Sequence, residues 1–262
     1  MNRALFFIFF VTACSLLPSA FKHFTCGVRV AKMELGYPYN PDFDLCPSAS
    51  PEVRAILQQP FDYLGKGSQS FAFASRDGHY VLKIFRRPKN LQNVATGLFR
   101  SLRGTAIAYR LAAEETGLLY VHLNQTNQQL PTVKLKDPLR RSLYLKLDQY
   151  WFVLQKRSIS LEEAFAQGPV QPRIDAFLAL LSSRIAKGIG NSDANISRNF
   201  GFVGERALEF DCGNYDLSPD LCVPEQRDLE MRRYRTKLRV WLTRHAPEGV
   251  PSVVGLEESR GR

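Results

Sequence analysis

Two glycines and a serine stand between two predicted strands. The run Phe61–Leu64 is strand-like, Gly65-Lys66-Gly67-Ser68 follows, and a strand pattern resumes at Phe71. Glycine lets a backbone approach phosphate groups closely and point its N–H groups at them. A Walker A loop would need a glycine where this chain has Pro60, and a Rossmann loop would open a helix. The segment therefore predicts a phosphate-binding glycine hairpin between antiparallel strands.

A single lysine interrupts a predicted apolar strand. Lys83 lies within Val81-Leu82-Lys83-Ile84-Phe85, with apolar neighbours on both sides. Its ammonium group must either extend to water or meet a buried anion. Phosphate oxygens would provide that anion, whereas a position on an edge strand facing water would need no ligand. The residues alone leave both interpretations open.

Two loops rich in carboxylates and carboxamides follow a predicted buried helix that opens at Pro172. The first loop carries Asp193, Asn195 and Asn199, and the second begins with Asp211 at the end of an apolar strand. Such groups, when a short hairpin separates their loops, can converge on Mg²⁺ and a hydroxyl. The same strings also form simple Asx turns. The two loops are thus candidates for a metal and acceptor site.

The order of these segments resembles the protein-kinase-like superfamily, which includes the aminoglycoside phosphotransferases. The region Phe61–Gly213 contains seven features in the order found in kinases. They are a glycine hairpin, a strand lysine, a helix, a hinge-like strand, a buried helix, an Asp/Asn loop and an Asp-x-Gly segment. The resemblance implies an α+β, bilobal fold with an antiparallel-sheet amino-terminal lobe and a truncated helical carboxy-terminal lobe. It also implies Mg²⁺-dependent transfer of the γ-phosphoryl group of ATP to a hydroxyl of a protein or small molecule.

The resemblance assigns six residues to ATP: Gly65, Gly67, Ser68, Lys83, Gln155 and Lys156. The first three would cover the phosphates, and the strand lysine would grip the α- and β-phosphates and support catalysis. The last two would lie at the hinge that contacts adenine through its backbone. Among the remaining candidates, Asp193 would orient the acceptor hydroxyl, Asp211 would hold Mg²⁺, and Asn199 or Asn195 would be a further metal ligand.

Several positions depart from the kinase pattern. Ser70 replaces the third glycine, and Asn191-Ser192 stand where His-Arg is expected. The helix predicted over residues 96–116 offers only Glu114 and Glu115, at its end, as partners for the strand lysine. These departures, and the export signal described next, support an alternative function, a catalytically inactive pseudokinase that acts as a secreted or membrane-associated binding module. A third interpretation is a secreted, disulfide-stabilised protein with no nucleotide function.

The amino terminus predicts export or membrane association. Ala4–Ala13 is an uninterrupted apolar run behind Arg3, typical of a secretory signal and short for a membrane span. Extension to Phe21 would make an anchor, and Val11–Cys14 resembles a lipobox. If the run is retained as an anchor, the positive charges that follow it favour a body facing the cytoplasm. The predicted organisation is a signal or anchor over 1–21, an irregular leader over 22–55, an amino-terminal lobe over 56–156 and a reduced helical carboxy-terminal lobe over 157–262.

Composition and cysteines add broader limits. The hydrophobic fraction of 45% excludes a largely disordered or collagenous chain, and a net charge of +10 suits anionic partners. A basic helix predicted near Glu225–His245 could contact an acidic membrane or partner, or be a solvated face over an apolar stripe. No segment carries a specific nucleic-acid signal. Cys26–Cys46 and Cys212–Cys222 are the local disulfide pairings, and free thiols are the alternative.

Overall fold

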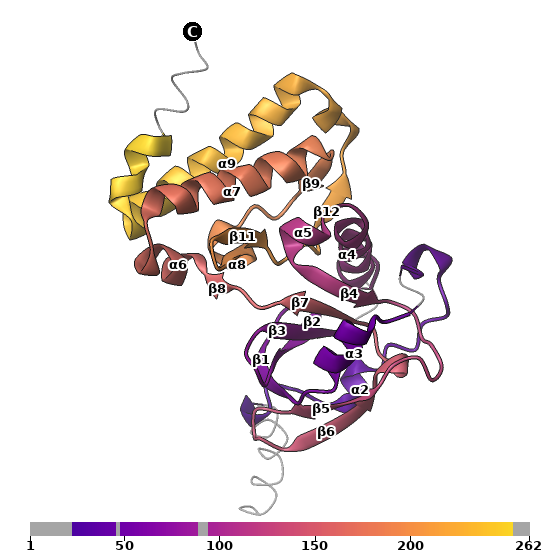
Figure 1. Cartoon of the computed structure of the whole chain (residues 1–262). Coiled ribbons are helices and arrows are strands. Elements are labelled where there is room, and N and C mark those ends of the chain that lie inside the picture. Colours follow the sequence, from indigo (N-terminus) through magenta and orange to yellow (C-terminus); the bar gives the residue numbers. More distant parts are fainter. Residues whose placement is uncertain (1–22, 46–47, 89–93, 254–262) are drawn as a thin grey trace, which may run out of the picture.

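The computed structural model describes residues 23–45, 48–88 and 94–253. Figure 1 shows two lobes, one built on a curved sheet and the other on long helices. The predicted α+β, bilobal kinase-like fold is confirmed. The predicted export segment and Cys46 lie outside the described residues. Within the described ranges, no helix is long and apolar enough to cross a membrane.

The amino-terminal lobe contains a seven-stranded sheet in the order β4-β7-β3-β2-β1-β5-β6. Its strands are β1 (Phe61–Lys66), β2 (Ser70–Ser75), β3 (Tyr80–Phe85), β4 (Leu118–His122), β5 (Thr132–Lys136), β6 (Ser142–Lys146) and β7 (Phe152–Lys156). All neighbours pair antiparallel except β1 and β5. The predicted meander of three strands is confirmed, and Gly78 adopts a φ of +79° in the turn between β2 and β3. Glycine takes this left-handed conformation without steric cost.

A helix covers this sheet where an irregular leader was expected. The helix α3 (Pro51–Leu57) buries Ile56 and Leu57 in the same core as Phe73 of β2. Ser50 accepts a hydrogen bond from the backbone of the third residue of the helix. A serine cap followed by proline is a strong helix start. The leader also contains the short helices α2 (Val30–Met33) and η1 (Pro41–Phe43), so its turn-rich composition concealed local order.

The helix predicted over residues 96–116 is divided into three parts, namely η2 (Val94–Phe99), α4 (Arg100–Leu111) and α5 (Ala113–Thr116). Ala112 breaks the helix because its dihedral angles, φ −139° and ψ 34°, are not helical. Gly117 ends it with a φ of +68°, as predicted.

The carboxy-terminal lobe is built on two long helices that lie side by side, α7 (Val170–Ala186) and α9 (Pro224–His245). Their predicted apolar stripes meet in one core, where Phe177, Tyr234 and Leu238 are fully buried. The remaining helices are α6 (Leu161–Gln167), α8 (Ile196–Asn199), η4 (Pro219–Cys222) and η5 (Pro247–Gly249), and η3 (Leu147–Gln149) precedes β7. The short strands are β8 (Ile159–Ser160), β9 (Ile189–Asn191), β10 (Phe200–Val203), β11 (Arg206–Glu209) and β12 (Tyr215–Leu217).

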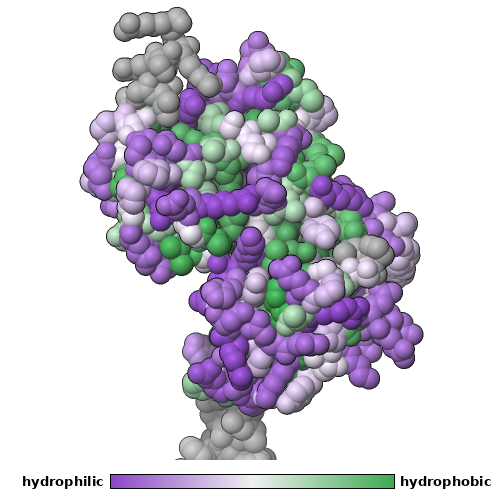
Figure 2. All heavy atoms as spheres, in the orientation of Figure 1, coloured by the Kyte–Doolittle hydropathy of each residue, from purple (hydrophilic) through white to green (hydrophobic). Residues whose placement is uncertain are grey.

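The described cysteines are free thiols. Cys212 is buried and Cys222 is exposed, so the predicted disulfide between them is wrong. Cys26 is also free and partly buried. Hydrophilic residues cover much of the face in Figure 2, with hydrophobic residues visible between them. The fold therefore rests on its apolar cores rather than on a bridge between these two cysteines.

Candidate functional site

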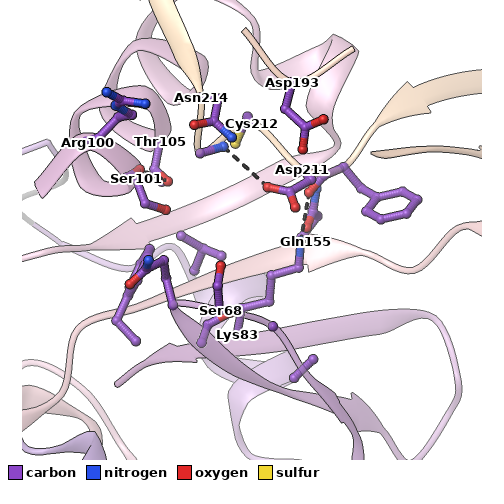
Figure 3. Close-up of a pocket in the computed structure, with 18 of the residues that line it drawn as sticks. Ser68, Lys83, Arg100, Ser101, Thr105, Gln155, Asp193, Asp211, Cys212 and Asn214 are labelled. Carbon is purple, nitrogen blue, oxygen red and sulfur yellow. Dashed lines mark hydrogen bonds between the residues drawn. The ribbon is translucent and has the colours of Figure 1, made fainter. Parts of the chain in front are cut away.

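A cavity of about 450 Å³ lies between the two lobes. The amino-terminal lobe contributes the hairpin Gly67–Ser70, Lys83 and Gln155 to its lining, together with residues of α4. The carboxy-terminal lobe contributes Asp193 and the segment 211–214. Figure 3 shows the carboxylates of Asp193 and Asp211 on the same side of this cavity. Its size is typical of a small-molecule or cofactor site.

Lys83 lies on an interior strand of the sheet. Its strand β3 pairs with β2 on one side and β7 on the other, so the edge-strand interpretation is wrong. The Nζ atom donates a 2.7 Å hydrogen bond to the carbonyl oxygen of Phe210 and lies 5.4 Å from the centre of its ring. The side chain therefore crosses from the sheet to the residue that precedes Asp211 (Figure 3).

The carbonyl of Phe210 accepts a second donor from the sheet. Gln155 Nε2 lies 3.2 Å from the same oxygen, and this nitrogen also donates to the carbonyl of Thr116. The Gln155 side chain is buried, where an amide without partners would be costly. Two side chains of the amino-terminal lobe thus hold the end of the segment that leads into Asp211.

The helix α4 packs directly against the segment that carries Asp211. A Cβ atom added to Gly104 would lie 2.6 Å from the carbonyl oxygen of Cys212 and 2.7 Å from that of Gly213. Both distances are too short for a real side chain, so glycine is required for this contact. Burial raises the pKa of the Cys212 thiol to about 12, which keeps it protonated near neutral pH.

A buried network connects the two acidic loops from behind. Asn191 Nδ2 donates to Glu209 Oε1 at 2.7 Å, and Asn191 Oδ1 accepts the backbone N–H of Asp193 at 2.8 Å. The hydroxyl of Tyr215 donates to Glu209 Oε2 at 2.7 Å. Because Glu209 lies two residues before Asp211, this network ties the backbone of one acidic loop to that of the other.

An arginine at the centre of the carboxy-terminal lobe neutralises this network. The side chains of Arg184 and Glu209 are both fully buried, and Arg184 Nε lies 3.4 Å from Glu209 Oε2. Glu230 lies 3.7 Å from the same guanidinium group, and the ring centre of Tyr234 lies 4.9 Å from its central carbon. Burial raises the pKa of Glu209, while Arg184, Tyr215 and Asn191 favour its charged form and oppose that rise.

The structure brings six of the predicted site residues to the cavity: Gly67, Ser68, Lys83, Gln155, Asp193 and Asp211. Four others do not line it: Gly65, Lys156, Asn195 and Asn199. The backbone N–H of Lys156 donates a hydrogen bond to the carbonyl oxygen of Gly117. This donor of the predicted hinge is therefore already used within the protein. Asn195 caps α8 by accepting the N–H of Arg198. Asn199 is buried and donates to the carbonyl of Asp193 at 2.8 Å, so it orders the loop.

Further polar residues of the lining were not predicted as site residues, and they include Arg100, Ser101, Thr105 and Asn214. Ser101 and Thr105 are four residues apart on α4, and this spacing would have placed them on one helix face. The helix α4 contains no acidic residue. Glu114 pairs with Arg206 at 3.0 Å, and Glu115 pairs with Lys187, so neither is the expected partner of Lys83.

The acidic side chains do not form a metal cage on their own. Among residues 23–45, 48–88 and 94–253, no group of three or more His, Cys, Asp or Glu residues could hold a metal ion. Asp193 and Asp211 are both exposed to solvent on the cavity side. Asp211 Oδ1 has one long hydrogen bond, from the N–H of Gly213 at 3.4 Å. Its carboxylate is therefore open to a further partner.

The comparisons with known proteins are distant. No protein-family model and no curated protein matches the chain. Similar solved structures include a crystal structure of WbdD, which is 12% identical with a TM-score of 0.43 over 68% of this chain. A second structure, of the "bifunctional kinase-methyltransferase WbdD", is 13% identical with a TM-score of 0.38 over 65% of this chain. The chain spans 37% and 34% of the lengths of those two chains. The likeness is a distant kinase-like one at most.

Proposed function

We propose that this chain is a Mg²⁺-dependent phosphotransferase that moves the γ-phosphoryl group of ATP to a hydroxyl of a protein or small molecule. One observation carries the proposal: Lys83 from the sheet and the carboxylates of Asp193 and Asp211 from the other lobe line a single cavity. Phosphoryl transfer depends mainly on positioning and charge stabilisation, which require a cation for the phosphates and carboxylates for metal and acceptor. This cavity combines those groups.

The hairpin of β1 and β2 fits a phosphate group. Gly67 lines the cavity, and a Cβ atom added there would have its nearest neighbour 4.0 Å away, at Ser70. Neither crowding nor a positive φ requires glycine at this position. Its missing side chain leaves space on the cavity side, where the backbone and the hydroxyl of Ser68 could approach a phosphate. Lys83 and Arg100 would supply positive charge to the same ligand.

The carboxylates fit separate tasks. ATP would supply the phosphoryl group, and Mg²⁺ would offset the charge of its phosphates. Mg²⁺ is commonly held by one or two carboxylates together with phosphate oxygens, so Asp211 suits it without an all-protein cage. Asp193 would accept the proton of the acceptor hydroxyl. Asn191 and Asn199 would position Asp193 through the backbone hydrogen bonds described above.

A pseudokinase function is the second candidate, and the surroundings of Lys83 favour it. Its ammonium group donates to a protein carbonyl, and the adjacent helix α4 carries no acidic residue to hold it toward a nucleotide. In this case the cavity would bind a nucleotide without transferring a phosphoryl group. The two candidates differ in turnover rather than in fold.

The test measures ATP affinity and transfer of radiolabelled γ-phosphate by the full chain with Mg²⁺. Lys83→Met removes a charge-assisted contact of about 1.5–3 kcal/mol, so ATP affinity should fall by roughly 10- to 100-fold. Asp211→Asn should abolish the Mg²⁺ dependence of ATP binding, because an amide is a poor substitute for a carboxylate ligand. Asp193→Asn should retain ATP affinity and lose roughly 10²- to 10⁴-fold in turnover.

Asp220→Asn is the matched control, because Asp220 is exposed and does not line the cavity. It should behave as the unmodified chain does. Transfer that persists unchanged in both Asp193→Asn and Asp211→Asn would refute the proposed residues. ATP binding without any transfer would support the pseudokinase, and absence of ATP binding would reject both functions.

A further inference from the structure

A second cavity, of about 540 Å³, adjoins the first at Asp193. One wall is the segment Ser192–Ser197, which includes the start of α8, and the other is the face of α9 that carries residues 233, 236, 237, 240, 241, 244 and 245. These positions recur every three to four residues, so they lie on one side of the helix. Since Asp193 lines both cavities, a molecule in the second would have a group beside the carboxylate that borders the first.

The lining of this second cavity is strongly basic. It includes the permanent cations Arg233, Lys237 and Arg244 and the ring of His245, against the single carboxylate of Asp193. The lining therefore carries a net charge of +2 with the histidine neutral, from three cations and one anion. A cationic acceptor would be repelled here, whereas an anionic one would be attracted.

Two of these cations have no acidic partner among residues 23–45, 48–88 and 94–253. Arg233 pairs with Glu230 at 3.2 Å, and His245 lies 3.8 Å from Glu162. No such ion pair is formed by Lys237 or Arg244 within the described ranges. Both side chains are exposed and line the recess beside Asp193. Their charge is thus available to a ligand.

An aromatic pair gives this wall a defined surface. Trp241 is buried in the core of the lobe, and the ring of His245 stacks on it with centres 4.7 Å apart and planes 18° apart. Because Trp241 is fixed by packing, the stacked ring is held in place beside Arg244. The recess therefore combines a packed aromatic surface with exposed positive side chains, and its volume lies in the range of small-molecule sites.

We propose that this second cavity is the acceptor site and that the acceptor is a small hydroxyl-bearing anion, such as a phosphorylated or carboxylated sugar or polyol. This inference rests on the proposed function. The anionic group would contact Lys237 and Arg244, and the hydroxyl would lie at Asp193. The acceptor oxygen would form a bond to the γ-phosphorus, whose bond to the β,γ-bridging oxygen breaks so that ADP leaves with the electron pair. The hydroxyl proton would pass to Asp193, and the product would be a new phosphomonoester.

The test compares four hexoses that differ in charge: glucose, glucose 6-phosphate, glucuronate and glucosamine. Binding to the full chain is measured by calorimetry without nucleotide, and phosphoryl transfer is measured separately with ATP and Mg²⁺. A charge-assisted contact changes affinity by roughly tenfold or more. We therefore expect at least one of the two anions to bind about tenfold more tightly than glucose, and glucosamine to bind least.

The variants Lys237→Gln and Arg244→Gln should each weaken binding of the preferred anion by about tenfold. Arg232→Gln is the matched control, since Arg232 is an exposed cation of the same helix outside the cavity lining. It should leave binding unchanged. Equal losses in Arg232→Gln and Arg244→Gln would show general electrostatic attraction and overturn the proposal.

Other outcomes separate this inference from the proposed function. ATP binding with no preference for an anionic sugar, or with no sugar binding at all, would overturn the acceptor site and leave the phosphotransferase intact. Binding to vesicles containing phosphatidylserine, with none to the soluble anions, would assign the basic face to a membrane and also overturn it. Selective binding of an anion without any ATP binding would support the cavity and reject the proposed function.

Discussion

Neutralising Glu209 should destabilise the protein more than neutralising an acid at its surface. The substitution Glu209→Gln preserves the size of the side chain but removes the charge that lies 3.4 Å from Arg184 Nε. The carboxylate accepts one hydrogen bond from Asn191 and one from Tyr215, on its two different oxygens. A glutamine has only one such oxygen, so its NH₂ group would face one of these two donors. Arg184 would then be a fully buried cation whose other acidic partner, Glu230, is 3.7 Å away.

The magnitude follows from burial. Removing one partner of a buried ion pair costs about 3–5 kcal/mol, because the remaining charge is left uncompensated. Glu230 compensates part of it, so we expect a loss near the lower limit, about 3 kcal/mol. For a chain of this size each kcal/mol corresponds to about 2–4 °C, which predicts a fall in Tm of about 6–12 °C.

The assay is thermal unfolding at neutral pH, followed by circular dichroism. Glu114→Gln is the matched control, because it breaks a 3.0 Å pair with Arg206 in which the side chains are 81% and 53% exposed. Exposed pairs contribute about 0–1 kcal/mol, so the control should change Tm by less than about 4 °C. The double variant Arg184→Met with Glu209→Gln should recover part of the loss, since it removes the unpaired cation. Equal changes in Glu209→Gln and Glu114→Gln would refute the reasoning.

Two further predictions concern α4 and the contact between α5 and α7. Gly104→Ala should lower both Tm and ATP affinity, because the added Cβ atom would meet the carbonyls of Cys212 and Gly213. In a helix without such a contact, alanine is about 1 kcal/mol more favourable than glycine. A rise in Tm would therefore contradict this prediction. Burial alone would raise the pKa of Glu115, but hydrogen bonds from Lys187 and Ser183 outweigh burial and lower it. The stability that Glu115 contributes should therefore be present above a pH of about 4.3 and be lost as pH falls through its lowered pKa. In Tm measured against pH, the advantage of the unmodified chain over Glu115→Gln should disappear in acid, and an advantage that persists there would contradict the assignment.

Local sequence patterns were sufficient to predict the strands β1, β2 and β3 beside the cavity. The meander of β1, β2 and β3 depends on short apolar runs and on the Asp77-Gly78 turn, all of which are visible in neighbouring residues. Gly117 likewise ends the helix before β4 as predicted, because its positive φ is a local requirement. The parallel pairing of β1 with β5 joins segments about seventy residues apart, and no local pattern reports it.

The site was predicted in part because its residues follow a recognisable order, whereas their partners depend on packing. Lys83 and Asp211 were candidates in their strand contexts, and the order of the surrounding segments assigned their roles. Whether Arg100 and Thr105 line the cavity depends on how α4 is oriented. Gly104 allows the observed orientation because it has no side chain to meet the segment 212–213. An isolated glycine in a helical pattern indicates a close contact, but it does not identify what makes the contact.

The hydrogen bond from Lys83 to Phe210 does not by itself exclude a nucleotide. A lysine ammonium group has three donors, and one of them is directed to the Phe210 carbonyl. The other two could reach phosphate oxygens while the first keeps the lysine beside Asp211. Because Gln155 donates to the same carbonyl, the segment before Asp211 would retain a contact with the sheet even if Lys83 turned fully toward a ligand. The ATP affinity of Lys83→Met therefore reports whether Lys83 uses its remaining donors for a phosphate, and transfer of the γ-phosphate then separates the two candidate functions.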